Sequence, residues 1–161
     1  MRATDPTKPN PTAQHRSVDD AWRNYGPPAL RFATVLVGPT DAHDIVTNAF
    51  LRVADWQSID HPQTYLLRAV RNEAQNHHRH RTRQRRRDLA AVPDAFAPNH
   101  ESNADIVQAL KKLTLRQRSI IFLAYWEDMT EAEIADTLDL STGTVHRTLS
   151  RARHQIRRDL S

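Results

Sequence analysis

The sequence contains no cysteine and only three glycines among its 161 residues. Without cysteine the chain can form neither a disulfide bond nor a thiolate metal site, which suits a reducing compartment. The shortage of glycine argues against a β fold rich in tight turns, and no segment alternates apolar and polar residues as a strand does. The sequence therefore predicts an all-α fold.

Long apolar runs are missing as well. No stretch approaches the roughly 20 residues needed to cross a bilayer, and the N-terminus has no hydrophobic segment of the signal-peptide type. We therefore expect a cytoplasmic protein that makes no contact with a membrane. The sequence also lacks a glycine-rich phosphate loop and paired carboxylates, so we expect neither enzymatic activity nor a cofactor.

Aromatic residues make up only 6% of the chain, which is enough for small helical bundles but not for one large core. Proline-rich polar segments divide the sequence. We predict four parts, namely a disordered leader (1–16), a helical domain (17–87), a flexible linker (88–103) and a second helical domain (104–161).

Local signals place the helices of the first domain. Residues 17–37 have a helical apolar pattern in two pieces, and we expect a bend or a break at Gly26-Pro27-Pro28. A second helix is predicted over residues 40–56. A third, long helix should begin at Pro62, because proline is favoured in the first turn of a helix.

Charge is distributed in blocks along the chain, whose formal net charge is +4. Residues 68–100 and 140–161 are basic, with net charges of +5 and +4, whereas residues 1–67 and 101–139 are acidic, with −1 and −4. Basic blocks on predicted helices are typical of proteins that bind a polyanion, of which duplex DNA is the first candidate.

The segment from Thr130 onward predicts a helix-turn-helix. Thr130 and Glu133 match a capping box, and an apolar stripe follows. Residues 139–141 form a turn of the right length, after which a second helix begins. The outward face of this second helix offers donors for phosphates and base edges, at Thr142, Thr144, His146, Arg147, Ser150, Arg151 and Arg153. A small bundle with a solvated basic face is the alternative interpretation.

Histidines cluster at residues 77–80, which raises the question of a metal site. His77 and His80 share one helix face, but no carboxylate or cysteine nearby completes a ligand set, and adjacent arginines would repel a cation. We therefore predict no metal site.

The residues 113–153 resemble region 4 of bacterial RNA polymerase sigma factors of the extracytoplasmic-function (ECF) group. The resemblance is carried in register by LTLRQR (113–118), TEAEIA (130–135), STGTV (141–145) and LSRAR (149–153). The sequence departs from the family at Asp139, where glycine is frequent, and at residues 146–148, where Lys-Ser-Arg is more usual.

Two stretches of the first domain resemble sigma region 2. Residues 41–53 are similar to the helix that binds the clamp helices of the polymerase β′ subunit, which implies contacts through Asp41, Asp44, Asn48 and Arg52. Residues 65–72 and 76–81 are similar to the regions that open the −10 element. The resemblance implies that this element is bound by Asn72, Asn76, His77, Arg79, His80 and Arg83.

Taken together, the resemblance implies a sigma factor that binds core RNA polymerase, through the β′ clamp helices and the β flap, and promoter DNA at the −35 and −10 elements. An anti-sigma factor is a further expected partner.

Two rival hypotheses remain open. One is a self-sufficient helix-turn-helix regulator, and the other is a histidine-dependent nuclease, for which the sequence lacks metal-binding carboxylates.

Overall fold

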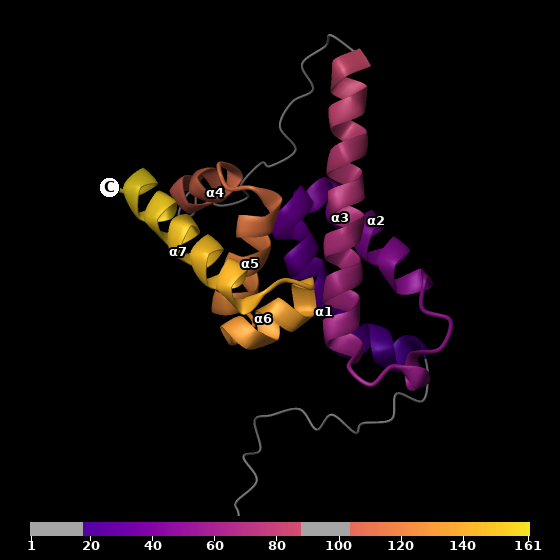
Figure 1. Cartoon of the computed structure of the whole chain (residues 1–161). Coiled ribbons are helices and arrows are strands. Elements are labelled where there is room, and N and C mark those ends of the chain that lie inside the picture. Colours follow the sequence, from indigo (N-terminus) through magenta and orange to yellow (C-terminus); the bar gives the residue numbers. More distant parts are fainter. Residues whose placement is uncertain (1–17, 88–103) are drawn as a thin grey trace, which may run out of the picture.

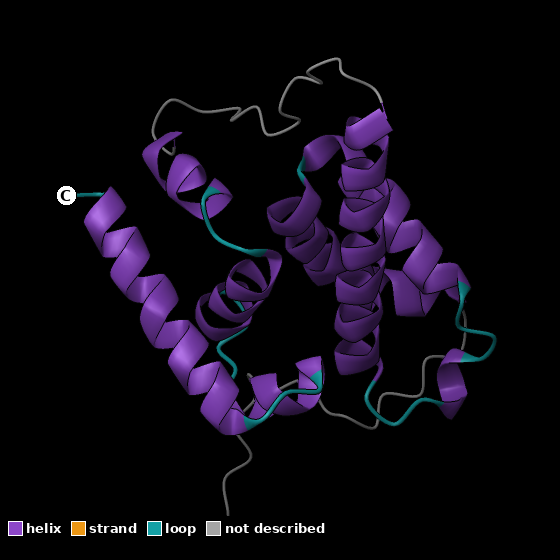
Figure 2. Cartoon of the chain, turned by 45° about the horizontal axis from the view of Figure 1, so that its top comes forward, coloured by secondary structure: helices purple, strands orange, loops and turns teal. Residues whose placement is uncertain are grey.

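The computed structural model describes residues 18–87 and 104–161. The predicted leader and the predicted linker lie outside the described residues. All regular structure within these two ranges is helical (Figure 2), which confirms the predicted all-α class. No helix in the described ranges is both long enough and apolar enough to span a bilayer.

Residues 18–87, here called the N-terminal half, contain three helices. They are α1 (Val18–Val37), α2 (Pro39–Leu51) and α3 (Pro62–Arg87), with a short 3-10 helix (Trp56–Ser58) before α3. The start of α3 at Pro62 confirms the prediction. The second helix ends at Leu51, earlier than predicted, and the chain reaches Trp56 through a loop.

Helix α1 continues as one helix through Pro27 and Pro28, so of the predicted bend or break the break is wrong. Proline in a helix interior removes backbone hydrogen bonds, but the buried face of α1 continues past this point at Ala29 and Phe32, both 0% exposed. Gly26 has a different role from the one expected. A Cβ atom there would lie 3.1 Å from the Trp22 ring, so glycine permits this ring to pack against α1.

Aromatic side chains hold α1, α2 and the loop before α3 together. The Trp22 ring meets the Phe50 ring edge-on with centroids 5.1 Å apart, and Phe50 stacks on Trp56 at 4.4 Å. Such pairs add about 0.5–1.5 kcal/mol beyond the burial of their area. They fix α2 against α1 and leave the opposite side of α2 exposed to solvent.

Residues 104–161, here called the C-terminal half, contain α4 (Ala104–Lys111), α5 (Leu115–Tyr125), α6 (Glu131–Leu138) and α7 (Thr142–Asp159). Helices α5 and α6 each begin with a complete capping box. The box at the start of α6 pairs Thr130 with Glu133, as predicted from the sequence.

The two halves pack against each other in this structure. Helix α5 contacts α1, and helix α6 contacts α3, so that α5 and α6 lie between α7 and the N-terminal half (Figure 1). The Phe32 and Phe122 rings meet across this contact with centroids 5.1 Å apart, and both side chains are almost fully buried. The hydrophobic core is therefore continuous from α1 into α5.

Candidate nucleic-acid interface

Helix α7 presents a row of exposed donors because its other side is buried. Val145, Leu149 and Ala152 are at most 5% exposed and pack toward α5 and α6. Six of the seven predicted recognition residues are exposed, namely Thr142, His146, Arg147, Ser150, Arg151 and Arg153. The structure thus leaves these six side chains exposed around the part of α7 that is not buried.

Thr144, the seventh residue, takes part in the local cap instead. Ser141 Oγ accepts a hydrogen bond from the Thr144 amide at 3.1 Å and lies 2.8 Å from the Thr144 hydroxyl. This arrangement satisfies a donor in the first turn of α7. Thr144 is half-buried and is therefore less available to DNA than its neighbours.

The turn before α7 depends on a left-handed residue. Asp139 has φ 55° and ψ 51°, and the amide of Leu140 donates to the carbonyl oxygen of Ala135 at 2.9 Å. Aspartate tolerates this conformation better than most residues with a side chain, although glycine is less strained there. The departure from glycine at Asp139 therefore leaves the geometry of the helix-turn-helix intact.

His146 is held by an acidic residue of α6. Its Nδ1 lies 3.1 Å from Glu131 Oε1 and 3.2 Å from Glu131 Oε2. A neutral His146 can satisfy this contact by donating from Nδ1, which leaves Nε2 as an acceptor toward the outside of the helix. Glu131 was not predicted from the sequence, because its partner is fifteen residues away in the next helix.

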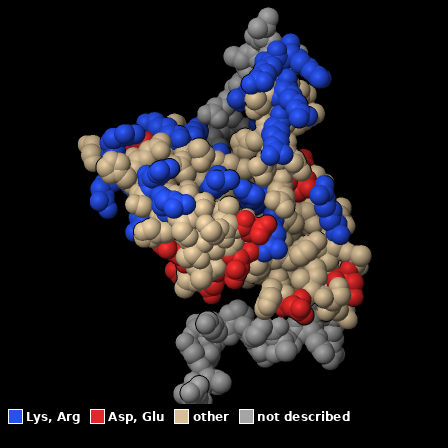
Figure 3. All heavy atoms as spheres, in the orientation of Figure 1, with Lys and Arg blue, Asp and Glu red and all other residues tan. Residues whose placement is uncertain are grey.

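Helix α3 carries the second basic surface. Asn72, Asn76, Arg79 and Arg83 are exposed and follow each other at steps of three or four residues, so they lie along one face, with His80 exposed beside them. Lys and Arg side chains gather along the part of α3 that projects beyond the other helices, and again over α7 on the same side of the molecule (Figure 3). The predicted strand-binding residues thus form one elongated surface.

His77 differs from the others because it faces α2. Its Nε2 lies 3.1 Å from Asp41 Oδ2, and Arg81 Nη1 donates to the same oxygen at 3.1 Å. Asp41 therefore joins α2 to two successive turns of α3. This contact places both His77 and Asp41 in a structural role between helices.

The four predicted polymerase-binding residues of α2 fall into two pairs. Asp41 faces α3 as described, and Arg52 forms an ion pair with Glu73 of α3, with Nη2 and Oε1 2.7 Å apart. Asp44 and Asn48, by contrast, are exposed one helical turn apart on α2. These two residues are the members of the predicted set that can meet a partner without disturbing α3.

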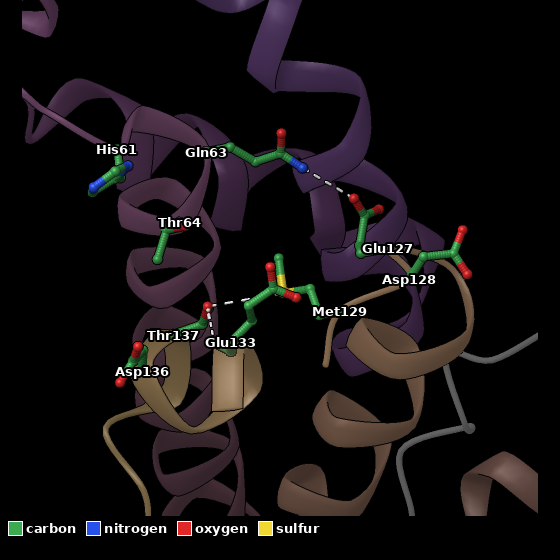
Figure 4. Close-up of a pocket in the computed structure, with 9 residues that line it drawn as sticks. All are labelled: His61, Gln63, Thr64, Glu127, Asp128, Met129, Glu133, Asp136 and Thr137. Atoms are coloured by element: carbon green, nitrogen blue, oxygen red, sulfur yellow. Dashed lines mark hydrogen bonds between the residues drawn. The ribbon is translucent and has the colours of Figure 1, made fainter. Parts of the chain in front are cut away.

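Two hollows flank the C-terminal half. A polar cavity of about 720 Å³ opens between the start of α3 and the α5–α6 segment, and it is lined by His61, Gln63, Thr64, Glu127, Asp128, Met129, Glu133, Asp136 and Thr137 (Figure 4). An apolar groove of about 420 Å³ lies between α4, α5 and α7. Its lining is Ile106, Leu110, Ile121, Tyr125, Trp126, Arg153, Ile156, Arg157 and Leu160.

Sequence reasoning did not identify either hollow, because each is lined by residues from helices that are far apart in the chain. The exposed aromatic pair Tyr125-Trp126, each 54% exposed, was the available signal for the apolar groove. Within the described ranges no group of three His, Asp or Glu side chains is placed to hold a metal ion.

Comparison with known proteins gives matches to both halves of the chain. A sequence model of Sigma-70 region 2 matches residues 21–84, and a model of Sigma-70 region 4 matches residues 103–156. The chain is 34% identical over 146 residues to the RNA polymerase sigma-E factor of Streptomyces coelicolor, covering 81% of this chain and 78% of that protein. It is 33% identical over 136 residues to the sigma-E factor of Streptomyces antibioticus, covering 76% and 72%.

A solved structure shares the fold. The sigma factor RpoE, in its co-crystal structure with the anti-sigma factor NepR from Bartonella quintana, superposes with a TM-score of 0.75 at 20% identity. The match covers 88% of this chain and 95% of that chain, so it includes both halves.

Acid should weaken the fold through His78. Its Nε2 donates to the Leu36 carbonyl oxygen at 3.1 Å, and burial lowers the pKa of His78 below its ordinary value of 6.5, with Arg118 acting in the same direction. The unfolded chain therefore takes up a proton at a higher pH than the folded chain does. We expect the free energy of unfolding to fall as the pH drops below about 6.5, measured by urea denaturation.

His78→Gln keeps a donor for the Leu36 carbonyl but cannot be protonated, so part of this pH dependence should disappear. His80→Gln, on an exposed position of the same helix, serves as the control and should keep it. An unchanged pH dependence in His78→Gln would contradict the assignment.

Proposed function

Because this chain belongs to the ECF type of the sigma-70 family of RNA polymerase sigma factors, we propose that it binds core polymerase and selects promoters with two separate surfaces. The observation that carries the proposal is the pair of basic, exposed surfaces on α7 and α3 in one chain. Each lies within a segment that matches a different sigma region.

In this proposal α7 reads the −35 element. The N-terminal part of the second helix of a helix-turn-helix enters the major groove, and in α7 this part carries Thr142, His146 and Arg147. The arginines can contact guanine edges or phosphates, and Ser150 can donate to a phosphate oxygen. Glu131 orients the His146 ring and so contributes to base preference.

The exposed face of α3 binds the −10 element during strand separation. Unstacked bases need polar side chains such as Asn72 and Asn76, and the displaced strand needs a positive groove, which Arg79 and Arg83 supply. His77 acts indirectly, since its contact with Asp41 fixes the position of α3.

Both the N-terminal half and the C-terminal half contact core polymerase in this proposal. Asp44 and Asn48 on α2 suit the β′ clamp helices, because both side chains are exposed. The apolar groove beside Trp126 suits an apolar segment of the β flap, since an exposed apolar patch with a polar rim is typical of protein contacts. An anti-sigma factor is a further partner, a class that the RpoE structure contains.

The nucleotide chemistry of transcription belongs to the polymerase in this proposal, and the chain supplies binding and positioning. The linked pair of surfaces raises the effective concentration of each at a promoter whose spacing is correct.

The test is a pull-down of bacterial core RNA polymerase with the purified chain, followed by run-off transcription on genomic fragments that include the upstream region of its own gene. Stoichiometric binding and new promoter-specific transcripts are expected. Tight, specific duplex binding by the chain alone without polymerase binding would instead favour a free-standing regulator.

Replacement of Arg147 and Arg151 by alanine should weaken binding to duplex DNA. If both arginines contact phosphates, the slope of log K against log salt should become less steep by about 1.8, which corresponds to two phosphate contacts. The measurement is fluorescence anisotropy with labelled duplex over a series of salt concentrations. The matched control is Arg157→Ala/Arg158→Ala, which removes the same charge from the last turn of α7 and should keep most of the slope.

Asp44→Arg should impair association with core polymerase while leaving the helical content unchanged, because Asp44 is exposed. We expect affinity to fall about tenfold through reversal of the charge at the contact. Asp19→Arg, an equal charge change on the exposed start of α1, is the control. Normal association of Asp44→Arg in a quantitative pull-down would mean that α2 is not the docking surface.

A further inference from the structure

A contact within the helix-turn-helix fixes the ring of His146 at the recognition surface. Glu131 is the first residue of α6, and its two carboxylate oxygens lie 3.1 and 3.2 Å from Nδ1 of His146 on α7. The His146 side chain is nevertheless 68% exposed. The second ring nitrogen, Nε2, takes no part in this contact and is left for another partner.

Glu131 is itself held in place. Its backbone belongs to the first turn of α6, which begins with the capping box of Thr130 and Glu133. A carboxylate is favoured at this end of a helix because the helix dipole is positive there. Helix α6 packs on α7, and the Glu131 side chain is only 35% exposed. The acceptor for Nδ1 is therefore in position before DNA arrives, so that binding costs less side-chain entropy.

The contact determines which ring nitrogen of His146 carries the proton. An ionised carboxylate can only accept hydrogen bonds, so Nδ1 must be the donor. The distances of 3.1 and 3.2 Å are those of a bond from a neutral N–H group, since a charged donor would lie about 2.7–2.9 Å from the carboxylate. In a neutral ring with its proton on Nδ1, the other nitrogen, Nε2, is an acceptor.

An acceptor on the recognition helix distinguishes the bases of DNA. In the major groove cytosine presents its N4 amino group and adenine its N6 amino group, whereas guanine and thymine present the carbonyl oxygens O6 and O4. Nε2 of His146 can accept from either amino group, but it would face another acceptor at guanine or thymine. A histidine without Glu131 could carry its proton on Nε2 and donate to those oxygens instead, and Glu131 removes this choice.

Gly143 leaves room for a base pair beside His146. It precedes His146 by three residues in α7, so the two lie on the same side of the helix. Its φ is not in the left-handed region, and a Cβ atom added there would meet no neighbouring atom within 4 Å. Neither backbone conformation nor packing within the described residues requires this glycine, although glycine is less favourable than alanine in a helix. A close approach of DNA accounts for the missing side chain.

We propose that Glu131 and His146 form a unit that selects an amino base, cytosine or adenine, at one position of the −35 element. His146 makes the contact through Nε2, and Glu131 is the positioning residue that keeps Nε2 an acceptor. The inference rests on the proposed function for the DNA element that α7 meets, whereas the position of the proton on the His146 ring is a property of the free chain.

Nitrogen-15 magnetic resonance of the full-length free chain tests the position of the proton. His146→Ala identifies which of the nine histidines gives the signal. At about pH 8, where histidine side chains are generally uncharged, we expect the proton on Nδ1 in the parent. A mixture of both forms is expected in Glu131→Gln, because the amide can either accept from Nδ1 or donate to it. A parent ring with its proton on Nε2 would overturn the proposal.

Base selection is measured with a pool of promoter fragments in which the −35 element is randomised and the transcribed part carries a barcode. Core polymerase with the full-length chain transcribes the pool at about pH 8. At one position the A·T and C·G pairs in one strand orientation should exceed the reversed pairs about tenfold, which corresponds to about 1.4 kcal/mol. His146→Ala should lose this preference and keep the preferences at other positions. A preference pattern unchanged in His146→Ala would overturn the contact.

Glu131→Gln should admit the reversed pairs at the same position, because a ring with its proton on Nε2 can donate to guanine or thymine. In the His146→Ala background the same change should have no further effect on this position. Asp136→Asn, which removes an equal charge from an exposed position farther along α6, is the matched control and should keep the preference. An unchanged preference in Glu131→Gln would show that Glu131 does not position the ring.

The amino group itself is tested on a synthetic promoter with adenine at the selected position. Purine, which lacks the N6 amino group, replaces this adenine. Binding by the polymerase with the parent chain should weaken about tenfold, whereas binding with His146→Ala should not change, because the contact is already absent. An equal loss with both chains would assign the effect to the altered DNA and would overturn the contact.

If the chain does not bind core polymerase, the proposed function fails, and the randomised duplexes are then selected by binding to the full-length chain alone. A strand-orientation preference that depends on both His146 and Glu131 in this selection would support the pair as a reader of DNA without polymerase. Selection of no sequence in either experiment would overturn the inference together with the role of α7.

Discussion

Four apolar side chains near the start of α3 anchor this helix to the rest of the protein, and both proposed functions of the N-terminal half depend on them. Leu66, Leu67, Val70 and Ala74 are at most 1% exposed and pack mainly against α1 and α2. Complete burial of a large apolar side chain contributes about 1.5–3 kcal/mol. After Ala74 no residue of α3 is buried, and beyond Arg81 the helix projects from the bundle with exposed arginines available to a polyanion.

The same principle governs α7 in the C-terminal half. A narrow apolar stripe fixes the helix against α5 and α6, and the remaining circumference is left to polar and basic side chains. Several acidic residues within the described ranges are used locally, as caps or as ion-pair partners between helices, and others lie along α6. This division explains how a chain with a net charge of only +4 presents two strongly basic surfaces.

Local patterns were sufficient to predict much of this architecture. The capping box at Thr130, the apolar spacing of Ile134 and Leu138 and the start of α3 at Pro62 are encoded by residues within a few positions of each other. The predicted break at Pro27 was wrong for a tertiary reason, since packing on both sides of the prolines offsets the missing hydrogen bonds. The contacts between the halves could not be predicted, because Arg68 and Thr137 are 69 positions apart and no local pattern joins them. The predicted domain boundaries and the individual DNA-binding and polymerase-binding residues stay predictions.

The carboxylate of Asp41 has a mechanical consequence. One oxygen atom of α2 receives His77 and Arg81 of α3, and Arg52 and Glu73 join the same two helices farther along. Polar side-chain contacts therefore join α2 to α3 at two places along the helices. Helices α2 and α3 therefore cannot shift relative to each other without breaking these contacts, so a partner bound on α2 and a strand bound along α3 would keep one fixed spacing.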